Sequence, residues 1–91
     1  MIEKIFYVIA FDSTHYAIRT EKMLKEKVKV DMIPTPREIS VSCGLSVKFS
    51  IDDIDKVQEE LLTYDKNGLH LFKLTKLEQG VRTAEKIEWS S

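Results

Sequence analysis

Apolar side chains recur along this chain with two different spacings, one typical of β-strands and one of α-helices. Residues 4–11 are almost continuously apolar, as in a strand that is covered on both faces. From Ile39 to Phe49 every odd position is apolar, whereas the even positions carry Ser, Gly or Lys, which is the alternation of a strand with one buried face. Gly44, in the middle of this segment, indicates a bulge or a close backbone approach, so we expect the strand proper to begin near Leu45.

Helical spacing marks two other segments. Residues 14–27 keep one face mostly apolar after the helix-start residues Asp12-Ser13-Thr14. A second helix is expected to open with a capping pattern at Ser50 and to be ended by Asn67-Gly68, a pair that accepts a positive φ.

Three shorter segments complete the chain. Residues 29–32 alternate and are followed by Pro34 and Pro36, which favours an edge strand because proline lacks an N–H group. Residues 69–75 are expected to form a fourth strand. The tail, residues 78–91, fits either a short helix or an added strand.

The element order β-α-β-β-α-β predicts an α+β fold of the ferredoxin-like type, a four-stranded antiparallel sheet with two helices on one face. The first and third strands would be central, and the second and fourth would lie at the edges. We expect residues 1–77 to form this single domain and residues 78–91 to form a C-terminal tail.

Composition narrows the possible partners. The 91 residues carry a net charge of −1, and the third strand has no run of basic and aromatic residues, so no nucleic-acid partner is expected. The longest apolar run, residues 5–11, is too short to cross a membrane. With no secretion signal and a single cysteine, Cys43, the expectation is a cytoplasmic protein in a reducing compartment. Too few Cys and His side chains are present to favour a metal site, and no cofactor is expected.

The predicted topology brings several chemically active side chains to one end of the sheet. A helix opening there presents unpaired N–H groups and a partial positive charge, which favour an anion. A cysteine at that position would have its thiolate favoured, so its pKa would lie below the ordinary value of ~8.5. The expected site consists of Cys43 as the reactive thiol, His15 as an accessory proton relay, and Ser13, Thr14, Arg37 and Gly44 as the anion-binding residues.

Ordinary structural roles remain open for the same residues. Cys43 continues the apolar face of its strand and fits a small buried core side chain equally well. Ser13 and Thr14 are typical helix caps. His15 fits a solvated surface position, and Arg37 can pair with Glu38 or bind carbonyl groups of its own turn.

Two stretches of the chain resemble a known family. They are Phe-Asp-Ser-Thr-His-Tyr-Ala at residues 11–17 and Pro-Thr-Pro-Arg-Glu-Ile-Ser-Val-Ser-Cys-Gly at residues 34–44, and they are similar to the small domain family described as putative selenium/sulfur carrier protein-like. The resemblance covers roughly residues 5–75 and implies a cysteine that carries sulfur or selenium as a persulfide-type adduct. Cys43 is the matching position. The resemblance implies a carrier rather than a stand-alone enzyme, with sulfur or selenium donor and acceptor proteins as partners.

Two other functions are compatible with the sequence. A small interaction module could dimerise or dock on a partner through its edge strand or through the tail that contains Trp89, with no covalent chemistry. A protein that binds a small anion without covalent chemistry could use the same site as the carrier. Its anion binding would then persist in the variant Cys43→Ser.

Overall fold

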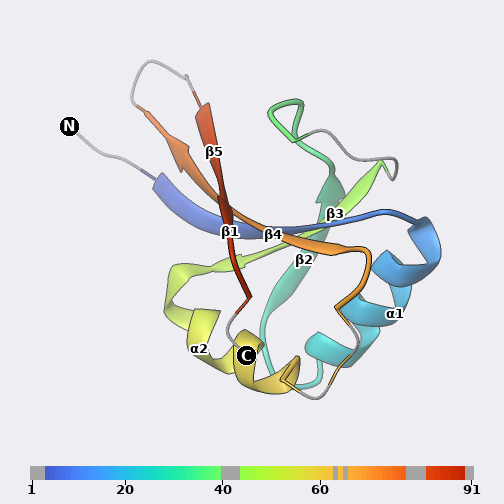
Figure 1. Cartoon of the computed structure of the whole chain (residues 1–91). Helices are drawn as coiled ribbons and strands as arrows, with labels where there is room; N and C mark the ends of the chain where they lie inside the picture. The colour runs from blue at the N-terminus through green and yellow to red at the C-terminus, as the bar shows by residue number, and fades with distance from the viewer. Residues whose placement is uncertain (1–3, 40–43, 63, 65, 78–81, 90–91) are drawn as a thin grey trace.

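The computed structural model describes residues 4–39, 44–62, 64, 66–77 and 82–89. Figure 1 shows how its strands and helices are arranged. In chain order they are β1 (Lys4–Phe11), α1 (Thr14–Leu24), β2 (Val30–Pro34), β3 (Leu45–Ser50), the 3₁₀ turn η1 (Ile51–Asp53), α2 (Ile54–Glu60), β4 (Leu69–Lys76) and β5 (Arg82–Ile87).

The strands form one sheet in the order β2-β3-β1-β4-β5, and every neighbouring pair is antiparallel. The predicted α+β class, with two helices and an antiparallel sheet, is confirmed. The predicted number of four strands is wrong, because the sheet has five. Its order therefore differs from that of a simple ferredoxin-like fold, and β4 lies inside the sheet instead of at its edge. β2 lies at an edge, as its prolines predicted.

The fifth strand comes from the tail, for which the sequence left helix and strand open. β5 pairs with β4 from Leu71↔Ile87 to Lys76↔Arg82. Just beyond it, the indole Nε1 of Trp89 donates to the Leu69 carbonyl oxygen at 3.0 Å. Trp89 is half-buried and packs against the main core cluster. The tail is thus a strand because its apolar side chains extend the core along β4.

Both helices are shorter than their spacing predicts. α1 ends at Leu24, and the following turn places Val28 in the core, with its N–H donating to the Leu24 carbonyl at 2.8 Å. The second helical segment opens at Ser50 as expected, where the hydroxyl accepts from the Asp52 N–H at 3.2 Å, but its first turn is 3₁₀. None of the helices among the described residues is long and apolar enough to cross a membrane.

β1 is buried on both faces, as its continuous apolar run predicted. Ile9 and Phe11 belong to a core cluster with side chains of α1 and α2, so both helices cover the same face of the sheet (Figure 1). Val8 and Ala10 point to the other face, where Ile39, from the connection between β2 and β3, packs on them. Each of these four β1 side chains is 0% exposed.

Gly68 joins the segment after α2 to β4 and provides a sharp test of this packing. Its φ is +80°, and a Cβ added there would lie 2.7 Å from a ring carbon of Tyr16. Gly68→Ala should therefore lower the free energy of unfolding by about 1–3 kcal/mol, measured by urea denaturation. Gly44→Ala is the matched control, because a Cβ at Gly44 meets nothing within 4 Å, and it should change the same quantity by less than about 0.5 kcal/mol. Equal effects of the two substitutions would contradict this account.

Candidate functional site

The turn from β1 into α1, residues 12–15, carries three of the predicted site residues. Ser13 is the N-cap of α1, and its hydroxyl accepts from the Tyr16 N–H at 3.4 Å. The capping role of Ser13 is therefore confirmed. Thr14 and His15 follow it with exposed side chains. The first turn of α1 contains no acidic residue, so no carboxylate in that turn offsets the partial positive charge of the helix N-terminus.

The start of β4 lies against one side of this turn. The Asp12 N–H donates to the Gly68 carbonyl at 2.9 Å, and Ala10 lies beside His70 in the strand register. The Nε2 of His70 and the Oδ1 of Asp12 are 2.9 Å apart. The side chains of His70 and Asp12 are 29% and 55% exposed, so the pair adds about 1 kcal/mol or less to stability. What it does fix is the direction in which the Asp12 carboxylate points.

Sequence reasoning missed the Asp12–His70 pair. The one signal that could have found the pair is the predicted strand order, which places the start of the fourth strand beside the end of the first. Among the described parts of the chain, no group of three or more His, Cys, Asp or Glu side chains could hold a metal ion.

The connection between β2 and β3 reaches the same end of β1 from the other side. Thr35 donates its N–H to the Gly44 carbonyl at 2.9 Å, and its hydroxyl lies 2.8 Å from that of the fully buried Ser46. Ser46 pairs with Ala10, so the residue that enters β3, Gly44, lies near the end of β1. Gly44 is exposed.

The other two residues predicted to lie at the turn of residues 12–15 are Arg37 and Cys43. Arg37 is exposed, two residues before Ile39, which packs on the sheet face opposite the helices. Among the described residues, no hydrogen bond or ion pair is found between Arg37 and the turn at residues 12–15. Cys43 lies outside the described residues. The structure thus brings Ser13, Thr14 and His15 together, and the convergence of Arg37 and Cys43 on them stays a prediction.

Trp89 does not have the exposed position that an interaction surface on the tail requires. Its ring is half-buried, and its N–H donates to the carbonyl oxygen of Leu69. This removes the observation that favoured docking through the tail.

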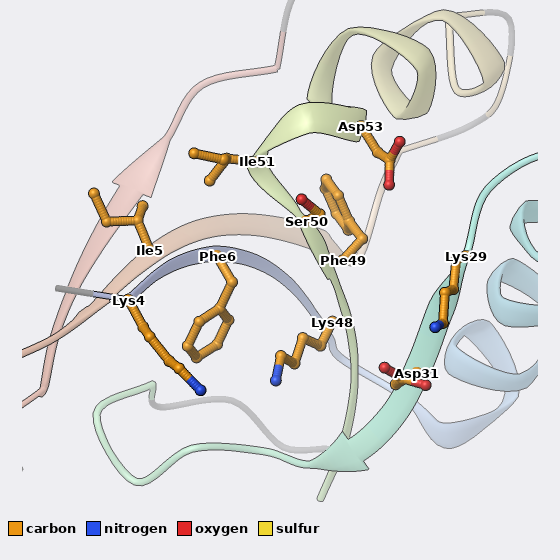
Figure 2. Close-up of a pocket in the computed structure, with 10 residues that line it drawn as sticks. All are labelled: Lys4, Ile5, Phe6, Lys29, Asp31, Lys48, Phe49, Ser50, Ile51 and Asp53. Atoms are coloured by element: carbon orange, nitrogen blue, oxygen red, sulfur yellow. The ribbon is translucent and has the colours of Figure 1, made fainter. Parts of the chain in front are cut away.

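A separate hollow lies at the other end of β1, and sequence reasoning did not find it. It has a volume of about 550 Å³. Figure 2 shows the side chains around it. They come from the start of β1, the approach to β2 and β2 itself, and the end of β3 with the turn that follows: Lys4, Ile5, Phe6, Lys29, Asp31, Lys48, Phe49, Ser50, Ile51 and Asp53.

Comparison with known proteins assigns the chain to a family. The family described as "Putative Se/S carrier protein-like" matches residues 6–73. The chain belongs to this family, as the two sequence stretches indicated. The chain is also 31% identical, over 67 residues, to the uncharacterized protein MJ0011 of Methanocaldococcus jannaschii. That alignment covers 74% of this chain and 34% of the relative, so the chain spans about a third of that protein's length. No solved structure matches.

The cap at Ser13 gives a direct test of how the turn is held. Ser13→Ala should lower the free energy of unfolding by about 1 kcal/mol, because the Tyr16 N–H loses its acceptor. Ser13→Asn keeps an acceptor at the same position and should lose much less. Both values come from chemical denaturation of the whole chain. Wild-type stability in Ser13→Ala would show that the hydroxyl does not cap α1.

Proposed function

We propose that this chain is a carrier that accepts sulfur or selenium from a donor protein on the Cys43 thiolate and passes it to an acceptor protein. The family match over residues 6–73 carries the proposal, because it spans the only cysteine of the chain. It is supported by the position of Gly44, the residue after that cysteine, at the entry to β3 and near the end of β1.

The transfer needs no external oxidant. The Cys43 thiolate attacks the outer sulfur of a donor persulfide, a new S–S bond forms on Cys43, and the donor leaves as a thiolate. The acceptor's nucleophile then attacks the terminal sulfur, and the Cys43 thiolate is the leaving group. In the selenium case a terminal selenium atom takes the place of that sulfur. The proton of the resting Cys43 thiol passes to His15, which is exposed and able to exchange it with water.

The charges around the opening of α1, residues 12–15, favour an anion there. The first turn of the 11-residue helix α1 holds no carboxylate, and Arg37 would add a full positive charge. Ser13, Thr14 and Gly44 would contribute hydroxyl and backbone groups around the anion. Asp12, the acid that directly precedes Ser13, directs its Oδ1 to His70 at 2.9 Å, which reduces its repulsion of a thiolate.

Uptake of a sulfur atom tests the proposal. The full chain, treated with glutathione persulfide and analysed by intact-mass spectrometry under native conditions, should gain the mass of one sulfur atom. Cys43→Ser should gain none. Lys22→Gln, in the last turn of α1, is a control that should match the wild type.

The rate of alkylation as a function of pH supplies the second readout. We expect the pKa of the Cys43 thiol to lie below ~8.5. Arg37→Gln should raise that pKa, because the thiolate loses a nearby positive charge, whereas Lys22→Gln removes an equal charge farther away and should leave it unchanged. A thiol that reacts only after unfolding would refute the carrier.

A further inference from the structure

The hollow at the start of β1 has an aromatic ring flanked by two ammonium groups. Lys4 and Phe6 lie two residues apart on one face of β1, and Lys48 comes from β3, where it pairs with Val8. The Nζ of Lys48 lies 4.7 Å from the centroid of the Phe6 ring. Figure 2 shows the Lys4 and Lys48 side chains on either side of this ring, on the same side of the sheet.

Neither Lys4 nor Lys48 forms an ion pair within 4.0 Å with a carboxylate of the described residues. Two ammonium groups beside one half-buried ring repel each other. An anion placed between them removes that repulsion and forms charge-assisted hydrogen bonds with both.

Acceptor groups lie on the opposite rim of the hollow. Asp31 on β2 pairs with Lys48 in the strand register, and its carboxylate is exposed. Figure 2 places it beside Lys29, on the far side of Lys48 from Lys4. A ligand that reaches from the two lysines to Asp31 must therefore carry an anionic group, a body that contacts Phe6, and a hydrogen-bond donor.

We propose that this hollow binds a nucleoside monophosphate. Its phosphate lies between Lys4 and Lys48, its base stacks on Phe6 in place of the Lys48 ammonium, and an amino or hydroxyl group donates to Asp31. The volume of about 550 Å³ falls within the range of pockets that hold small ligands, roughly 300–1,000 Å³.

The hollow is independent of the proposed carrier site. β1 spans eight residues, so at about 3.4 Å per residue its two ends lie about 24 Å apart. The site residues in the turn at 12–15 follow the last residue of β1, whereas Lys4 is the first. A nucleotide ligand would therefore bind without touching the turn.

Titration calorimetry on the full chain tests the proposal, with AMP, adenosine and inorganic phosphate as probes. AMP should bind saturably with one site, and adenosine and phosphate should each bind at least about tenfold more weakly, because each lacks half of the contacts. Lys48→Gln should weaken AMP binding about tenfold. Lys22→Gln removes one charge outside the hollow and should leave AMP affinity within about twofold of the wild type.

A variant of the ring separates stacking from charge. Phe6→Leu keeps an apolar side chain on this face of β1 and should weaken AMP binding while leaving phosphate binding unchanged, with circular dichroism to verify folding. Absence of saturable AMP binding would overturn the proposal. Equal losses in Lys48→Gln and Lys22→Gln would overturn it as well, because they would indicate non-specific charge attraction. So would tight binding of a single-stranded oligonucleotide without binding of AMP, which would identify a nucleic-acid interface instead.

Discussion

Strand β1 is hydrogen-bonded to β3 along one side and to β4 along the other, and its side chains are buried on both faces. This double pairing determines which elements meet at each end of β1. Where β1 ends, it brings together the opening of α1, the start of β4 and the entry to β3. Where β1 begins, it forms the wall of a hollow between lysine side chains. The family's proposed carrier chemistry belongs to the first end, and the proposed nucleotide site belongs to the second.

Much of this fold could be predicted from local patterns. The continuous apolar run of β1 indicated burial on two faces, the alternation before Phe49 located β3, and the prolines placed β2 at an edge. The errors came from contacts between distant residues. α1 ends early because Val28 is drawn into the core through a turn. The tail becomes a fifth strand because Ile87 and Trp89 pack beside β4, and no local spacing in residues 78–91 distinguishes that strand from a helix.

The candidate site was predictable only where it depends on one segment. Ser13 follows from the capping preference of a single helix, and the structure confirms its cap. The Asp12–His70 pair joins residues 58 positions apart, and its contact depends on the register of β1 against β4. The hollow requires Phe6 and Lys48 to meet across two strands. The predicted strand order places these residues on neighbouring strands, but it does not give the register that brings their side chains into contact.

The central claim is that Cys43 works beside the opening of α1. A nitroxide attached to this single natural cysteine tests it through the broadening of backbone amide signals in NMR spectra. The account predicts strong broadening at Ser13, Thr14 and His15 and little at residues 51–53, beyond the other end of β3. The reverse pattern, with residues 51–53 broadened and the turn at 12–15 unaffected, would contradict it.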